Sequence, residues 1–384
     1  MKSDGSHAVV ADHVFDGRRR HEHAGVIIDG SRVSRLVPRG EIPRSIPVRI
    51  LPDGAWLTPG FIDLQVNGGG DALFNDAPTP EAISIIAAAH RRFGTTGFLP
   101  TLISDTPEKM QVAIAAVQMA MRTEPTVLGI HLEGPFLSPE RAGIHDHRLF
   151  RQPTPADAEM LTAPRRGTLL VTLAPEQVPA GFIARLAGAG ACVSLGHSMA
   201  TYAQTRTAID EGLTGFTHLF NAMRPMVSRE PGPIAAALET PTCSFGLIVD
   251  GIHVDPAMLR LALRGVGRPM LVTDAMPPVG GKRSTFTLYG DEIEVQDGRC
   301  ARGDGTLAGA YLDMATAVRN CVHLLGLPLE RALIFASSHP AHFINRGTEL
   351  GRLAPGSRAD MVALDPQKVE VLETWVAGIT DETL

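Results

Sequence analysis

Four residues whose side chains can bind a metal or transfer a proton stand at the ends of short apolar segments. Glu133 ends VLGIHLE, His197 ends VSLGH, His218 ends GFTH and Asp274 ends MLVTD. One carboxylate and two imidazoles form a ligand set that binds zinc and leaves a coordination position open for water. A further carboxylate beside such a water can take its proton and later deliver it to a leaving group. The pattern indicates metal-dependent hydrolysis, with Asp274 as the catalytic residue.

These residues are too far apart in the sequence to form a local zinc motif, so the fold must bring them together. Apolar runs alternate with segments of helical periodicity, which is typical of a parallel sheet covered by helices on both faces. Eight such units predict an α/β fold of the (β/α)8 TIM-barrel type, in which active sites lie at the C-terminal ends of the strands. The eight predicted strand segments are 60–68, 97–104, 127–134, 169–176, 192–198, 215–223, 246–254 and 270–276.

Both ends of the chain have a different pattern of short β-like runs separated by Asp-Gly, Pro-Gly and Asp-Pro turn signals. We expect residues 1–57 and 351–384 to pair as one small β domain. Residues 58–350 then form the hydrolase domain. Within it, the stretch after the eighth apolar run predicts a β-hairpin excursion, and long loops on barrels usually help to build the site.

The composition restricts the possible partners. The formal net charge is -6, from 35 Lys+Arg and 41 Asp+Glu, which gives no support for nucleic acid or an anionic membrane as a partner. The N-terminal residues lack the apolar core of a signal peptide, and no run approaches the ~20 apolar residues of a membrane helix. We therefore expect a cytoplasmic protein, in which an anionic ligand would need a local cationic site.

Several segments give the chain a specific resemblance. In order, it contains PGFIDLQVNGGG, GIHLEGPFL, GHSMAT, THLFNAM, DGIHV and LVTDAM. Together they resemble the amidohydrolase superfamily and, within it, the family of N-acetylglucosamine-6-phosphate deacetylases. The resemblance implies a (β/α)8 barrel with a small β-sandwich from both termini. It also implies hydrolysis of the N-acetyl group of N-acetyl-D-glucosamine 6-phosphate to acetate and D-glucosamine 6-phosphate, and a homodimer.

Carried over position by position, the family's metal ligands fall on Glu133, His197 and His218, and its catalytic aspartate falls on Asp274. In that family, the arginine that matches Arg229 reaches the phosphate of the substrate in the neighbouring subunit. The family's substrate contacts fall on His145, Asn221, Ala222, Arg229, His253, Leu307, Ala308 and Gly309.

The chain departs from the wider superfamily at the end of the first apolar run. Most amidohydrolases have His-x-His there, whereas this chain has Gln65-Val66-Asn67. Amide oxygens bind a borderline-soft divalent metal less well than imidazole does, so we expect one metal ion rather than two. Zinc is the preferred ion, with iron, cobalt and manganese as alternatives. Gln65 and Asn67 are expected to position water or substrate.

The residues leave other interpretations open. The galactosamine epimer is an alternative substrate, because contacts to sugar hydroxyls cannot be deduced from one sequence. A cyclic-amide hydrolase would usually have His-x-His and a modified lysine, and the apolar runs contain no lysine. A catalytically silent barrel would normally have lost its ligands. His131, two residues before Glu133, is expected to support the site or pack in the core rather than bind the metal.

Overall fold

The structure is a computed structural model and describes residues 5–380. Its central feature is an eight-stranded sheet in the order β15-β14-β13-β12-β11-β10-β9-β6, and every pairing with a printed register between these strands is parallel. A parallel bridge from Val66 to Ala275 joins the two ends of this order. The predicted barrel is confirmed. Its strands are β6 (Phe61–Val66), β9 (Thr95–Ile103), β10 (Gly129–Glu133), β11 (Thr168–Leu173), β12 (Cys192–Leu195), β13 (Gly215–Phe216), β14 (Ser244–Leu247) and β15 (Arg268–Leu271).

Helices follow the barrel strands, and several of them begin at a residue whose side chain caps the helix N-terminus. The Thr106, Thr154 and Thr201 side chains each accept a hydrogen bond from a backbone N–H of the first turn. A proline follows Thr106 and Thr154, where its missing N–H costs no helical hydrogen bond. These helices are α1 (Pro80–Arg91), α2 (Pro107–Ala120), α3 (Pro155–Thr162), α4 (Phe182–Gly188), α5 (Tyr202–Asp210), α6 (Gly232–Glu239) and α7 (Pro256–Ala262).

A hairpin excursion separates the eighth barrel strand from the last helices. Strands β16 (Thr285–Leu288), β17 (Asp291–Gln296) and β18 (Arg299–Ala301) form an antiparallel sheet, as predicted. Leu288, Ile293 and Cys300 of this sheet share one buried apolar cluster with Ile103 and Met276. The hairpin therefore packs against Ile103 at the end of β9 and against Met276 in the segment that follows β15. Two short strands, β7 (Gly68–Gly69) and β8 (Ala72–Leu73), pair after β6.

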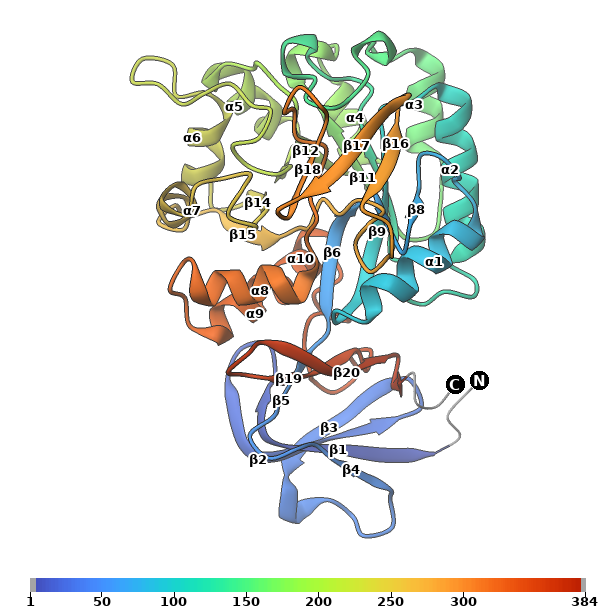
Figure 1. Cartoon of the computed structure of the whole chain (residues 1–384), viewed down its shortest axis with the longest axis vertical. Helices are drawn as coiled ribbons and strands as arrows, with labels where there is room; N and C mark the ends of the chain where they lie inside the picture. Colours follow the sequence, from blue (N-terminus) through green and yellow to red (C-terminus); the bar gives the residue numbers. More distant parts are fainter. Residues whose placement is uncertain (1–4, 381–384) are drawn as a thin grey trace. The chain divides into compact units, whose positions relative to one another are not determined.

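The terminal segments form a second sheet. Strand β5 pairs with both β1 and β19, so segments from the two ends of the chain lie side by side (Figure 1). The prediction that both termini build one small β domain is confirmed. Its strands are β1 (Ser6–Phe15), β2 (Arg20–Asp29), β3 (Arg32–Pro38), β4 (Val48–Ile50), β5 (Trp56–Pro59), β19 (Met361–Asp365), β20 (Glu370–Val376) and β21 (Ile379–Thr380).

By their contacts, the described residues form two compact units. One contains residues up to 63, 90–97 and those from 313 onward, and the other contains 64–89 and 98–312. The first unit includes α8 (Met314–His323), α9 (Leu329–Ala336) and α10 (Ser338–Phe343). The predicted domain boundaries, 1–57 with 351–384 against 58–350, stay a prediction. Among residues 5–380, no helix combines the length and apolar composition needed to cross a membrane.

Candidate active site

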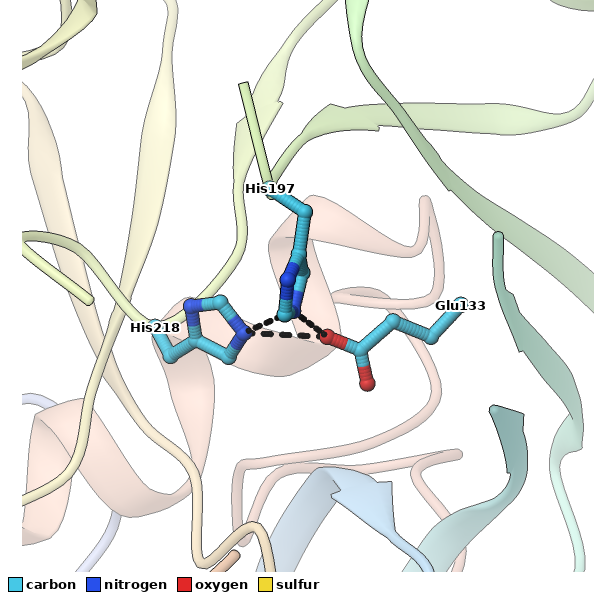
Figure 2. Close-up of side chains that lie close together, drawn as sticks. All are labelled: Glu133, His197 and His218. Carbon is cyan, nitrogen blue, oxygen red and sulfur yellow. Dashed lines mark hydrogen bonds and ion pairs between the residues drawn. The ribbon is translucent and has the colours of Figure 1, made fainter. Parts of the chain in front are cut away.

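Three side chains at the ends of β10, β12 and β13 converge in the second unit. The Oε1 atom of Glu133 lies 3.1 Å from Nε2 of His197 and 2.9 Å from Nε2 of His218, and the two Nε2 atoms lie 3.1 Å apart. Figure 2 shows both rings and the carboxylate pointing toward one another. All three residues are buried. The structure therefore brings together the three residues that were predicted as metal ligands.

Hydrogen bonding prepares this cluster for a cation. Nδ1 of His197 lies 2.7 Å from the carbonyl oxygen of Arg141, which can only accept, so Nδ1 carries a proton and Nε2 of the neutral ring presents a lone pair. Burial opposes ionisation of Glu133, but the two imidazoles, when they carry a proton on Nε2, outweigh it and hold the pKa of Glu133 well below its usual range. The ligand atoms lie within 4.8 Å of one another. A divalent ion ~2.0–2.2 Å from each fits this donor set.

The backbone holds three of the site residues in an uncommon conformation. His197, His218 and Asp274 have φ angles of 48°, 33° and 52°, in the left-handed region that non-glycine residues rarely adopt. Each residue comes just after a strand of the barrel, where the chain must turn away from the sheet. Strain of this kind persists only where the surroundings enforce it, and it often marks functional sites.

Asp274 is held by two amides. Oδ1 of Asp274 accepts hydrogen bonds from Nε2 of Gln65 at 3.0 Å and from Nδ2 of Asn67 at 2.7 Å. Gln65 Nε2 also lies 3.1 Å from Oε2 of Glu133. Burial, together with the charge of Glu133, raises the pKa of Asp274 to about 6 despite the Asn67 hydrogen bond. Gln65 and Asn67 thus contact a carboxylate, and their expected role in positioning water or substrate stays a prediction.

A cavity of about 270 Å³ adjoins both the three proposed metal ligands and Asp274. It contains most of the predicted substrate-contacting residues, whereas the predicted contacts Ala308 and Arg229 are not among its lining residues. Ala308 is fully buried, and Arg229 is exposed on the loop before α6. The lining residues are Asn67, Ile103, Glu133, Gly143, Ile144, His145, His197, His218, Asn221, Ala222, Ile248, His253, Asp274, Met276, Thr306, Leu307 and Gly309.

His145 is positioned by a residue that the sequence analysis missed. Its Nδ1 atom accepts from the Ser104 backbone N–H at 3.4 Å and lies 2.9 Å from Ser104 Oγ. Because the backbone N–H can only donate, the proton of the neutral imidazole is on Nε2. Burial lowers the pKa of His145 well below its usual value, and so does the nearby His197 ring. His145 is therefore a neutral donor in the cavity wall.

The hairpin supports this arrangement, because the Tyr289 hydroxyl donates to the Ser104 carbonyl oxygen at 2.6 Å. A signal for Ser104 was present in the sequence. It ends the second apolar run, GFLPTLIS, just as the metal and acid/base candidates end theirs. Tyr289 had no such signal, because it contacts β9 only through the packing of the hairpin.

His253 has the opposite proton arrangement. Its Nδ1 atom lies 2.6 Å from Oδ2 of Asp250, and the backbone N–H groups of Ile252 and His253 donate to Oδ1 of the same carboxylate. Burial opposes ionisation of Asp250, but these bonds hold the pKa of Asp250 below its usual value. The carboxylate thus accepts a hydrogen bond from Nδ1–H of His253. The Nε2 atom of His253 remains available to interact with a ligand.

The sequence matches the model of the amidohydrolase family over residues 56–381, so the chain belongs to this family of hydrolases. It is 44% identical over 326 residues to an N-acetylgalactosamine-6-phosphate deacetylase of Shewanella sp. (strain ANA-3), covering 84% of this chain and 82% of the relative. It is 33% identical over 358 residues to an N-acetylglucosamine-6-phosphate deacetylase of Haemophilus influenzae, covering 92% and 93%.

A solved structure of a deacetylase has the same fold as this chain. The crystal structure of N-acetylglucosamine-6-phosphate deacetylase from Pasteurella multocida superposes with a TM-score of 0.94 at 33% sequence identity. The superposition covers 98% of this chain and 100% of the other. The resemblance that the sequence motifs indicated is therefore confirmed at the level of family and fold.

Proposed function

We propose that this enzyme hydrolyses the N-acetyl group of an N-acetylhexosamine 6-phosphate, releasing acetate and the amino-sugar phosphate. N-acetyl-D-glucosamine 6-phosphate is the substrate suggested by the sequence motifs, and N-acetyl-D-galactosamine 6-phosphate is the alternative. One observation carries the proposal. In a family whose similar members are deacetylases of these sugars, Glu133, His197 and His218 converge in a cavity that Asp274 also lines.

In this proposal Glu133, His197 and His218 hold one divalent ion, with zinc preferred over iron, cobalt or manganese. When bound, such an ion lowers the pKa of a coordinated water to about 7 and polarises a carbonyl group. Asp274 is the catalytic residue. Gln65 and Asn67 occupy its Oδ1 atom, so Oδ2 is the oxygen that takes the proton from the attacking water and gives it to the leaving amine.

His145 stabilises the charge that develops on the acetyl oxygen. Its Nε2–H group is a donor because the Ser104 N–H group occupies Nδ1. A neutral donor suits this role, since it stabilises a developing oxyanion without offering a full charge to the ground state. We assign the orientation of the substrate carbonyl to this residue.

The phosphate requires positive charge that the cavity itself does not supply, because its lining residues include no lysine or arginine within the part of the chain described. Asn221, Ala222 and His253 are proposed to contact the far end of the sugar, with Leu307 and Gly309 forming the adjacent wall and Ala308 supporting it. The exposed position of Arg229 supports its assignment to the phosphate in the neighbouring subunit of a homodimer. A cytoplasmic location and no nucleic-acid or membrane partner complete the proposal.

Acetate release from the two epimers tests the proposed activity. Purified protein with one equivalent of Zn²⁺ is assayed on both N-acetylhexosamine 6-phosphates and on unphosphorylated N-acetylglucosamine. We expect turnover of at least one phosphorylated epimer and a much lower kcat/KM without the phosphate. The ratio of kcat/KM between epimers assigns the substrate, for which the 44% identical relative favours galactosamine. No acetate from either phosphorylated epimer would contradict the proposed function.

The proposed dimer has its own test. Inactive Asp274→Asn and Arg229→Ala chains are mixed under conditions that exchange subunits. If Arg229 serves the neighbouring site, mixed dimers recover one active site that has both residues. Failure to recover activity, with exchange verified by mass, would contradict the cross-subunit contact.

A further inference from the structure

A continuous chain of buried polar groups crosses the barrel interior next to the candidate metal ligands. Thr101 Oγ1 lies 3.2 Å from His131 Nδ1, and His131 Nε2 lies 2.7 Å from Thr172 Oγ1. Thr217 Oγ1 then lies 2.7 Å from both Thr172 Oγ1 and Ser194 Oγ. These five residues, called the polar layer below, are all buried, and His131 is 1% exposed.

The polar layer connects neighbouring strands of the barrel. Thr101 lies in β9, His131 in β10, Thr172 in β11 and Ser194 in β12, while Thr217 directly follows β13. The Val66 backbone N–H extends the chain to β6 by donating to Thr101 Oγ1 at 2.9 Å. Six strands that are consecutive in the sheet are thus joined by side-chain hydrogen bonds in addition to their backbone pairing.

This content is unusual for the inside of such a barrel. The interior is normally filled by branched apolar side chains, which pack well but do not specify direction. Both ring nitrogens of His131 have a hydroxyl group within hydrogen-bond distance, and a neutral imidazole uses one nitrogen as donor and the other as acceptor. Hydroxyl groups can fill either role. The polar layer is therefore fully hydrogen-bonded and defines one arrangement of the strands it joins.

Members of the polar layer adjoin residues of the site in the sequence. His131 is two residues before Glu133, so both side chains lie on the same face of β10. Thr217 precedes His218, and Val66 separates Gln65 from Asn67. A shift of any of these strands would move a metal-ligand candidate or an amide that holds Asp274.

We propose that the polar layer centred on His131 and Thr172 positions the metal-ligand cluster, so that its loss weakens metal binding before it alters the fold. His131 and Thr172 are positioning residues in this view, since neither is expected to touch the metal or the substrate. The inference rests on the metal site of the proposed function. It concerns how that site is held rather than which substrate it serves.

The test compares Thr172→Val with Thr172→Ser. Valine keeps the β-branched shape and removes the hydroxyl, whereas serine keeps the hydroxyl. The affinity for Zn²⁺ is measured by competition with a chromophoric chelator, and the visible spectrum is recorded on Co²⁺-loaded protein. Groups that hydrogen-bond a metal ligand directly typically contribute 10–100-fold in affinity, and Thr172 acts one contact further out, so its effect should lie at the low end of that range. We expect Thr172→Val to bind Zn²⁺ about tenfold more weakly and to change the Co²⁺ spectrum, with Thr172→Ser close to the wild type.

Thermal unfolding of the metal-free proteins separates positioning from packing. A lower unfolding midpoint for Thr172→Val with unchanged Zn²⁺ affinity and Co²⁺ spectrum would overturn the proposal. If Thr172→Val does not fold, Ser194→Ala tests the proposal instead, because it removes only the last hydroxyl group of the polar layer. We then expect Ser194→Ala to bind Zn²⁺ about threefold more weakly. This effect is smaller than that of Thr172→Val, because Ser194 does not contact the His131 ring. Unchanged affinity would overturn the proposal.

The same measurements distinguish this inference from the proposed function. If the wild-type protein binds no Zn²⁺ or Co²⁺, the metal site of the proposed function fails, and the inference fails with it. If the wild type binds one ion and Thr172→Val binds it equally well, only the inference about the polar layer fails.

Discussion

Two groups of side chains lie beside each other at the strand ends, and the charge of each group is balanced in a different way. In the first, one Glu133 oxygen and two imidazole nitrogens approach within 3.1 Å of one another, so lone pairs and negative charge converge on one point. In the second, Oδ1 of Asp274 accepts two amide N–H groups. The first group is therefore suited to bind a cation, whereas the carboxylate of the second group already has two hydrogen-bond donors.

The difference is consistent with the proposal that the site holds one ion. Where most amidohydrolases place His-x-His, this chain has Gln65 and Asn67, and both direct an N–H group at Asp274. Amide donors orient a carboxylate without the strong charge of a second metal. Burial and the charge of Glu133 raise the pKa of Asp274 to about 6, near the range in which a general base works.

Removing a member of the first group should have the largest effect. We expect His218→Ala to lose most of its bound zinc and at least about 10³-fold of its turnover, because three protein ligands are the usual minimum for a catalytic zinc. Metal content by mass spectrometry and acetate release provide the measurement. His323→Ala, at an exposed position on α8, is the matched control and should keep both. Full zinc retention by His218→Ala would contradict the ligand assignment.

Asp274→Asn tests the second group with the ion in place. Asparagine has nearly the same shape but cannot take a proton, so kcat should fall about 10²–10⁴-fold. Zinc content should match the wild type, because Asp274 is not one of the three ligands. Wild-type turnover in this variant would exclude Asp274 as the base.

Asn67→Leu sharpens the comparison, because it removes one amide donor from Asp274. The donor stabilises the carboxylate, so its loss should raise the pKa of Asp274 above its value of about 6. Activity that needs the ionised form is lost as pH falls through this pKa. The acidic limb of kcat/KM should therefore move up by about one pH unit. A lower rate with an unmoved limb would mean that Asn67 acts elsewhere.

The smallest effect is expected at the wall that holds His145. Ser104→Ala removes the hydroxyl near Nδ1 but keeps the backbone donor, so kcat should fall only about fivefold, with zinc content unchanged. Tyr289→Phe should lower kcat by even less, since Tyr289 acts only through Ser104. Tyr311→Phe, at a residue 47% exposed, serves as control. A Tyr289→Phe loss larger than that of Ser104→Ala would indicate a more direct role for the hairpin.

The sequence predicted the barrel and the residues that end its strands, because apolar runs alternate regularly with helices and because strand ends meet on one face of a barrel. Glu133, His197, His218 and Asp274 were found by this rule alone. The partners of Gln65 and Asn67 were not, since the contact with Asp274 arises only where the last barrel strand closes on the first. The hydrogen bonds of His131 also required the structure, because they cross from one strand to the next.

The number of ions in the active enzyme tests the comparison most directly. Metal-free protein is titrated with Zn²⁺ while acetate release from an N-acetylhexosamine 6-phosphate is followed. The amides at Asp274 take the place of a second ion in our account, so activity should rise linearly and saturate at one equivalent per chain. Saturation only at two equivalents would contradict it.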